Sequence, residues 1–431
     1  MRKGAVILIL LLLLCACDKN HSAEAAHESE ETAPEGTCYD FHYGTLLSVG
    51  GGSNILETED AVYYLFQDHV YYSDKTYKEF LPLCGKPNCD HRNEDCDAYL
   101  CTKSGIWIYD GYLYYVDAVP ESDDHEVFVT EPALWRMRLD GTRHEKLLQL
   151  PVRDFGFTPF RNSWSYLFTT KYLYVSYAAY QTEMINPEAS DGAGRCAYVI
   201  CLDSLRVSEL PSADAPDTQG FVGLPLAGRG STLYSVCSHK GGADDGRLEL
   251  SVFDFETLKG RRIGTLAENF YYLEGGFLLL DHAFEYLCFD AVNMRMSLYR
   301  MDLETGENEL LREGGPSEVK WNTMDWANRY LFAHRRSNLL DRSEWGFYVF
   351  DSDLNEVDVL SYADAPEEIA KIRVFLQTDS YIFAAPEASM DPEHPEVVGL
   401  YAAFTIPTWY IDKAEIGTGT LAWHRWAPEE D

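Results

Sequence analysis

The stretch Ser297–Glu313, SLYRMDLETGENELLRE, shows the pattern that decides the fold. An alternating aromatic and aliphatic run ends on Asp302, a short polar turn containing a glycine follows, and a second run ends in apolar residues. Such alternation is typical of β-strands, and an aspartate that begins a tight turn accepts hydrogen bonds from the backbone two residues further on. The stretch therefore predicts a β-hairpin.

The same pattern occurs seven times, each copy with an aspartate at the end of its first strand: Asp74, Asp140, Asp203, Asp254, Asp302, Asp351 and Asp412. Each copy after the first follows two further strand-like runs, such as 105–111 and 112–118, 269–276 and 277–283, or 321–329 and 330–334. Four strands per unit at this period predict an all-β fold, a seven-bladed β-propeller of four-stranded antiparallel blades. Six or eight blades are the alternatives, because the first and last units are the least regular.

The first 17 residues have the features of an export signal. Arg2 and Lys3 precede the apolar run Ala5–Leu14, which is too short to span a bilayer as a helix. The sequence Leu14-Cys15-Ala16-Cys17 then resembles the bacterial lipobox, in which a small residue precedes the cysteine that becomes lipid-modified. The resemblance implies lipidation of Cys17 and a membrane anchor made of lipid. The alternative is a signal peptide with incidental cysteines.

The rest of the chain divides into two segments by composition. Residues 18–37 contain no aromatic residue and no Val, Ile or Leu, so we expect a flexible acidic tether over 18–43. The tyrosine-rich, β-branched sequence of 44–431 is the predicted propeller.

The chain is strongly acidic, with 35 basic and 70 acidic residues and a net charge of −35. This charge repels phosphate backbones and anionic lipid headgroups, which argues against nucleic-acid binding and against electrostatic docking to a membrane. It is compatible with basic partners or divalent cations, and it also serves solubility.

One connection is rich in possible metal ligands. Residues 84–96, CGKPNCDHRNEDC, link the first predicted blade to the next, whose inner strand is expected near Ile106. Three thiolates and one imidazole form the donor set of a tetrahedral zinc site, and a turn at Pro87–Asn88 would fold the loop back on itself. The predicted ligands of a structural zinc are Cys84, Cys89, His91 and Cys96.

Disulfides are the competing interpretation of this loop. An exported chain can oxidise its thiols, and the five cysteines from Cys38 to Cys101 allow two bridges and one leftover thiol. Cys101 is also a substitute ligand for the metal. Of the other cysteines, Cys196 and Cys201 are expected on opposite faces of one strand, and Cys288 in the core.

Two stretches resemble a known repeat. YLYYVD, Tyr112–Asp117, and LWRMRLDGT, Leu134–Thr142, are similar to the YWTD repeat of propellers of the low-density lipoprotein receptor type, although Tyr replaces Trp and seven units are counted rather than six. LYRMDLETGE, Leu298–Glu307, repeats the second half. Together with the lipobox and the Cys-rich loop, the chain resembles a group of bacterial surface lipoproteins. The resemblance implies an extracytoplasmic propeller anchored by lipid to the bacterial cell membrane.

The sequence contains none of four common catalytic, metal-binding or nucleotide-binding motifs: G-x-S-x-G, H-E-x-x-H, G-x-x-x-x-G-K-[ST], or G-x-G-x-x-G before a helix. It therefore favours a noncatalytic binding or scaffold module for a protein, peptide or glycan. The alternatives are an extracellular enzyme acting on polysaccharide in the propeller funnel and a sensor subunit of an envelope complex. Candidate ligand-binding residues are Trp321, Asp325, Trp326 and Arg329, although the two tryptophan rings can also simply pack between blades.

Overall fold

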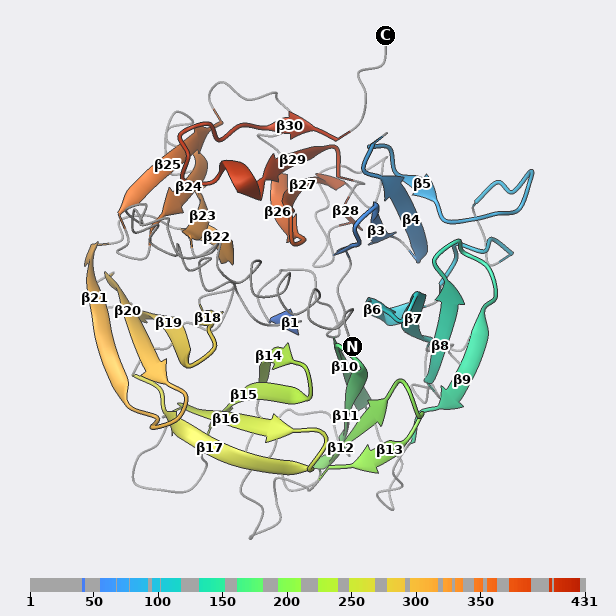
Figure 1. Cartoon of the computed structure of the whole chain (residues 1–431), viewed down its shortest axis with the longest axis horizontal. Coiled ribbons are helices and arrows are strands. Elements are labelled where there is room, and N and C mark those ends of the chain that lie inside the picture. Colours follow the sequence, from blue (N-terminus) through green and yellow to red (C-terminus); the bar gives the residue numbers. More distant parts are fainter. Residues whose placement is uncertain are drawn as a thin grey trace, which may run out of the picture. The chain divides into compact units, whose positions relative to one another are not determined.

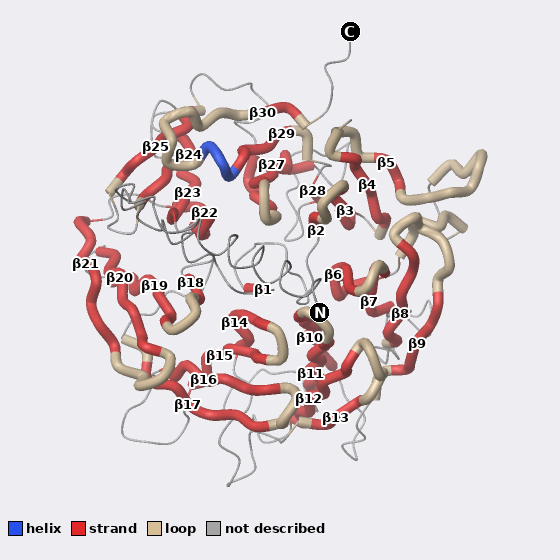
Figure 2. Tube along the Cα trace, viewed as in Figure 1, coloured by secondary structure: helices blue, strands red, loops and turns tan. Residues whose placement is uncertain are grey.

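A computed structural model of the chain shows seven β-sheets in its described part (Figure 1; Figure 2). The chain divides into two compact units, Met1–Gly36 and Thr37–Asp431, and only the second contains described residues. The described residues are 41–42, 55–66, 68–76, 78–91, 95–100, 102–117, 132–151, 161–180, 193–210, 224–238, 248–267, 277–290, 295–316, 321–327, 330–335, 345–351, 355–362, 372–388, 403–404 and 407–426.

The strands of each blade follow one another in the sequence, from the centre of the ring to its rim (Figure 1). Blade 1 is β2 (Ile55–Glu57), β3 (Ala61–Phe66), β4 (His69–Asp74) and β5 (Leu81–Pro82). Blade 2 is β6 (Thr102–Tyr109), β7 (Tyr112–Asp117), β8 (Ala133–Arg138) and β9 (Glu145–Gln149). Blade 3 is β10 (Arg161–Thr169), β11 (Tyr172–Tyr180), β12 (Ala193–Cys201) and β13 (Val207–Glu209). Blade 4 is β14 (Leu224–Arg229), β15 (Thr232–Ser238), β16 (Leu248–Asp254) and β17 (Lys259–Thr265).

The other three blades have the same order. Blade 5 is β18 (Phe277–Leu279), β19 (Ala283–Asp290), β20 (Arg295–Asp302) and β21 (Asn308–Pro316). Blade 6 is β22 (Trp321–Ala327), β23 (Tyr330–Arg335), β24 (Gly346–Phe350) and β25 (Glu356–Ser361). Blade 7 is β26 (Ile372–Gln377), β27 (Tyr381–Ala388), β29 (Trp409–Asp412) and β30 (His424–Arg425), with β28 (Ala403–Phe404) paired to β27 and a 3₁₀ turn, η4 (Lys413–Glu415).

The predicted seven-bladed propeller is confirmed, and the seven aspartate hairpins are the outer strand pairs of the blades. Two details differ from the expectation. Blade 1 also has an inner strand pair, β2 and β3. In blade 5 the run 277–283 was expected as a second strand, but Phe277–Leu279 is the innermost strand and Ala283–Asp290 the second. The run 269–276 lies outside the described residues.

The core lies between the blades, because the inner strands of a blade bury both of their faces. On β3, Val62 and Tyr64 pack against blade 7, whereas Ala61 and Tyr63 pack against blade 2. Successive side chains of a strand point to opposite faces, so one run of apolar residues supplies two interfaces. Seven such apolar clusters join the seven neighbouring pairs of blades.

The turn aspartates do what their residue type predicts. The side chains of six of them accept hydrogen bonds from backbone N–H groups two to four residues further on: Asp74, Asp140, Asp254, Asp302, Asp351 and Asp412. Hydrogen bonds from Thr142 hold the pKa of Asp140 below its ordinary value. Asp203 accepts a hydrogen bond from the Tyr109 hydroxyl of blade 2, and this bond raises the pKa of Tyr109 to about 12.

The ring closes between blade 1 and blade 7 without a shared strand. All strands of blade 1 come from the N-terminal part of the ring, and all described strands of blade 7 from its C-terminal part. Trp426, which is 1% exposed, packs edge-on against Phe383 with ring centroids 4.7 Å apart, in a cluster that includes Tyr64 of blade 1. Its indole N–H donates to the Ser73 hydroxyl at 3.0 Å. In the described residues, no strand pairs across this seam, and its contacts are made through side chains.

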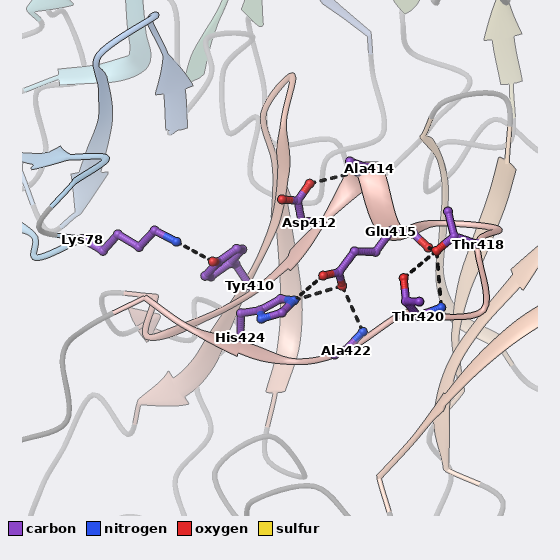
Figure 3. Close-up of polar contacts among 9 residues, drawn as sticks. All are labelled: Lys78, Tyr410, Asp412, Ala414, Glu415, Thr418, Thr420, Ala422 and His424. Atoms are coloured by element: carbon purple, nitrogen blue, oxygen red, sulfur yellow. Dashed lines mark hydrogen bonds and ion pairs between the residues drawn. The ribbon is translucent and has the colours of Figure 1, made fainter.

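Polar contacts supplement the seam (Figure 3). Lys78 of blade 1 donates to the Tyr410 hydroxyl of blade 7, and its ammonium lies 4.6 Å from the centre of the same ring. Within blade 7, His424 Nε2 lies 2.8 Å from Glu415 Oε1, which ties η4 to the outermost strand β30.

Glu57 forms a second polar contact of the seam. Its side chain is 5% exposed, pairs with Lys75 at 2.6 Å and accepts a hydrogen bond from the Ser380 backbone N–H of blade 7 at 2.9 Å. Burial alone would raise the pKa of Glu57, but Lys75 and hydrogen bonds from Thr378 and Ser380 outweigh burial and hold it below its ordinary value.

One strand lies apart from the regular blades. β1 (Phe41–His42) pairs antiparallel with β14, the innermost strand of blade 4 (Figure 1). These residues fall within the predicted tether 18–43, whose residues 18–40 lie outside the described part. In that described part, no helix has the length and apolar character needed to cross a membrane.

We expect Trp426→Ala to lower the free energy of unfolding by about 3–5 kcal/mol, because a large buried side chain is lost where the ring closes. Urea unfolding at neutral pH measures the change. The control is Val359→Ala on the outermost strand β25, where the side chain is 40% exposed and the expected change is within about 0.5 kcal/mol. Equal effects of the two substitutions would contradict the role of the seam.

We expect Glu57→Gln to lower the free energy of unfolding at pH 7 by about 1–3 kcal/mol, because Lys75 loses its partner. A carboxylate with a lowered native pKa stabilises the fold above its unfolded pKa, and the contribution is lost as the pH falls through the native value. The variant should therefore lose less stability than the wild type between about pH 6 and pH 3.

The control for this pH series is Glu145→Gln. Glu145 is 57% exposed and paired with Arg136 on the outer strands of blade 2, so the salt bridge contributes little. Parallel pH curves for the wild type and Glu57→Gln would show that Glu57 does not carry the acid sensitivity.

Candidate metal centre

The Cys-rich loop connects β5 to β6 and extends outward from the ring beside β5 (Figure 1; Figure 2). Both of its ends are held by β4: Leu83 N–H donates to the Val70 carbonyl, and Val70 N–H donates to the Ala98 carbonyl, both at 2.8 Å. The chain thus leaves β4 near Cys84 and returns to it just after Cys96. This pairing brings two of the predicted ligands together at the base of the loop.

The loop turns at the residues that the sequence indicated. Asn88 has a positive φ of 64°, and the Cys89 N–H donates to the Lys86 carbonyl at 3.4 Å, so the predicted turn at Pro87–Asn88 is present. His91 also has a positive φ, 54°. Non-glycine residues seldom adopt this conformation, and the turn it makes brings His91 back toward Cys96.

The four predicted ligands come together. One donor atom each from Cys84, Cys89, His91 and Cys96 lies within 4.8 Å of all the others. His91 Nδ1 is 3.3 Å from Cys96 Sγ. Tetrahedral zinc with Zn–S of about 2.3 Å and Zn–N of about 2.0 Å places its donor atoms about 3.5–3.8 Å apart. The arrangement can therefore surround a single zinc ion after small side-chain movements.

Two of the thiols have perturbed acidity. Burial would raise the pKa of Cys84, but hydrogen bonds from the backbone N–H groups of Lys86 and Asp97 outweigh it and hold the pKa below its ordinary value. Burial raises the pKa of Cys96 to about 12, although the Ala98 N–H donates to its sulfur at 3.4 Å. Because a metal binds thiolates, metal binding must release the Cys96 proton, and affinity must fall in acid.

Lys86 joins the two arms of the loop, a role that its sequence position did not reveal. Its ammonium forms a 2.8 Å ion pair with Asp97 and donates to the Asp95 carbonyl. The hydrogen bond with Asp97 raises the pKa of Lys86. Lys86 is half exposed, so the pair adds little energy but fixes the arms that carry Cys84 and Cys96.

The base of the loop is part of the apolar cluster between blades 1 and 2. Cys96, Ala98 and Leu100 are buried there at 3%, 0% and 1% exposure. Gly141, with a φ of +79°, lies so close that an added Cβ would be 2.2 Å from the Leu83 carbonyl oxygen. The turn of blade 2 therefore packs directly on the first arm of the loop.

A site with four protein ligands has no open position for water or substrate. Such closed sites are structural, whereas catalytic zinc has three protein ligands and one exchangeable position. The arrangement is suited to holding the loop in shape.

The other cysteine predictions are confirmed where the structure describes the residues. Cys84, Cys89 and Cys96 are free thiols, and the remaining members of the disulfide alternative, Cys38 and Cys101, lie outside the described residues. Cys196 and Cys201 join different apolar clusters, as expected of opposite faces. Cys288 is a buried core residue, as predicted.

The predicted ligand-binding residues are only partly described. Trp321, Asp325 and Trp326 lie on β22, the innermost strand of blade 6, as expected, and Arg329 lies outside the described residues. Their role in binding stays a prediction. Elsewhere, Trp164 stacks on Tyr166 with ring centroids 6.1 Å apart, and Tyr166 packs between blades 2 and 3.

No family model matches the sequence, and no curated protein matches it. Solved structures with a similar fold include an oligogalacturonate lyase in complex with manganese, at 14% identity over 88% of this chain and 90% of that one, with a TM-score of 0.45. An oligogalacturonate lyase from Vibrio parahaemolyticus is 12% identical over 82% and 88%, with a TM-score of 0.45. Porphyromonas gingivalis dipeptidyl peptidase 4 is 8% identical over 79% and 57%, with a TM-score of 0.44. These similarities concern the fold alone.

We expect protein purified without reductant to contain about one zinc per chain and to keep the loop thiols reduced. Cys89→Ser should lose the zinc, because one of the four ligands is removed, while Cys201→Ser on β12 should keep it. Elemental analysis and thiol counting measure both quantities. A metal-free protein with paired cysteines, or full zinc in Cys89→Ser, would refute the site.

Proposed function

We propose that the chain is a lipid-anchored, extracytoplasmic β-propeller that binds or scaffolds a protein, peptide or glycan without catalysing a reaction. In this proposal its zinc is structural and shapes a loop on the rim. The observation that carries the proposal is the closed donor set of Cys84, Cys89, His91 and Cys96, which leaves a bound metal no position for a substrate.

The buried carboxylates of the described blades support the same conclusion. Glu249 pairs with Arg262 at 2.7 Å, and Glu285 pairs with Arg300 across neighbouring strands. Glu57 is engaged in the seam by Lys75. A catalytic acid or base needs a proton that it can exchange with a substrate, whereas these groups are neutralised by cations of the fold.

The anchor rests on the sequence. Arg2, Lys3, the apolar run Ala5–Leu14 and the small residue before Cys17 together describe the lipoprotein signal. A net charge of −35 gives no attraction to anionic headgroups, so the lipid has to supply the membrane affinity. The proposed location is the outer side of a bacterial cell membrane.

The proposed likeness to YWTD-type repeats falls on adjacent strands. YLYYVD is β7, and LWRMRLDGT contains β8 and its turn, so the two halves of the likeness lie side by side in blade 2. Because those repeats are built around the same strand pair, we include the chain in the proposed group of surface lipoproteins.

We expect Cys17→Ala to abolish acylation and to release the chain from the membrane fraction when the full precursor is expressed in bacteria, because the acceptor thiol is lost. Cys15→Ala is the matched control and should stay acylated and membrane-bound. Mass spectrometry of the N-terminal peptide and cell fractionation give the result. Membrane retention of Cys17→Ala, or loss of anchoring in Cys15→Ala, would rule out the anchor.

The noncatalytic part of the proposal has a separate test. Purified zinc-loaded protein, incubated with bacterial and plant polysaccharides, should release no new reducing or unsaturated ends. Steady product release would favour the alternative of an extracellular enzyme.

A further inference from the structure

The N-terminal strand of the ring reaches its centre. β1 pairs with β14 in the register Phe41↔Gly228 and His42↔Ala227, and it also contacts β10 of blade 3. In Figure 1 it lies beside the innermost edge of blade 4. In the described residues, the innermost strands of the other six blades pair only with the second strand of their own sheet.

The inner edge of blade 4 is suited to backbone pairing. An innermost strand has a row of N–H and C=O groups with no partner on its channel side, and such an edge accepts another strand. The positions that pair with β1 carry the smallest side chains, Ala227 and Gly228. Glycine within a strand often marks a place where another backbone approaches closely.

Two further features fix this edge. An added Cβ at Gly228 would lie 2.2 Å from the Thr169 Cγ2 of blade 3, so blade 3 leaves no space for a side chain there. The ladder between β14 and β15 shifts register between Pro225 and Ala227, directly beside the paired positions. Such bulges bend a strand and recur next to binding sites.

We propose that the inner edge of blade 4 is a binding site for an extended peptide, and that Phe41–His42 is its intramolecular occupant. The peptide adds a strand to β14 through main-chain hydrogen bonds, the mode known as β-augmentation. The inference rests on the proposed binding role and specifies its ligand as a peptide, but it does not depend on the lipid anchor.

Because β1 already occupies this edge, a peptide from a partner has to compete with it. In the described residues, β1 pairs Phe41 and His42 with β14, so a short ladder holds it there. Its attachment to the ring nevertheless keeps it at a high effective concentration, on the order of millimolar for a short flexible linker. A peptide from a partner therefore binds weakly until the resident strand is displaced.

The test uses the chain from Asp18 onward and its variant Phe41→Pro/His42→Pro, which lacks both backbone N–H donors of β1. The probe is a synthetic peptide of residues 37–44 with Cys38→Ser. We expect it to bind the double-proline variant at least about tenfold more tightly than the parent chain. The matched control, His27→Pro/Glu28→Pro, places the same substitutions in the predicted tether and should behave as the parent.

Hydrogen exchange of residues 224–230 gives a second measurement in the same samples. Exchange should be faster in the double-proline variant than in the parent and should slow again when the peptide is added. The inference is overturned if a folded double-proline variant fails to bind the peptide, or if exchange at 224–230 is the same in all three proteins. Binding of a glycan or a whole protein without binding of the peptide would contradict this inference but would agree with the proposed function.

Discussion

Each sheet of the ring has two apolar faces and can bury neither by itself. The second strand of a blade sends alternate side chains to its two neighbours, as Tyr172 and Tyr174 do toward blade 4 while Leu173 and Val175 face blade 2. Burial of apolar surface is the main favourable term in folding, and here it exists only between sheets. The ring must therefore be complete, since a gap anywhere would expose two faces at once.

This arrangement explains where variation is tolerated. Because the blade faces hold the structure together, the connections at the rim are free to carry other features. In blade 1 the outermost strand is only two residues long, and the segment after Cys96 continues the edge of β4 through hydrogen bonds at Ala98 and Leu100. The Cys3His cluster lies in the loop that connects β5 to the segment after Cys96. This cluster thus takes the place of a longer fourth strand.

The features that were predictable from sequence are local ones. The turn aspartates depend on contacts within a few residues, and the four predicted metal ligands lie within thirteen positions. The run Phe277–Leu280 was assigned to the wrong strand of blade 5 because both of its faces are buried. Phe277 and Leu279 face blade 4, and Leu278 and Leu280 face blade 6. A continuous apolar run has no period from which to place it in its sheet.

Contacts between distant segments could not be derived in this way. The pair Lys86–Asp97 depends on how the two arms of the loop return to β4, and β1 depends on an edge nearly two hundred residues away in blade 4. Nothing in the local pattern around Trp426 indicates that it faces blade 1. Such placements follow from closure of the whole ring.

Closure through side chains of blade 1 and blade 7 sets an order of events during biosynthesis. Ser73 and Trp426 are 353 positions apart, so a ribosome finishes blade 1 long before the indole that covers it has been made. Until then the nascent chain carries an uncovered aromatic face, the kind of surface that draws chaperones and promotes aggregation. For this architecture, the outer strands of blade 7 decide whether the first sheet is ever protected.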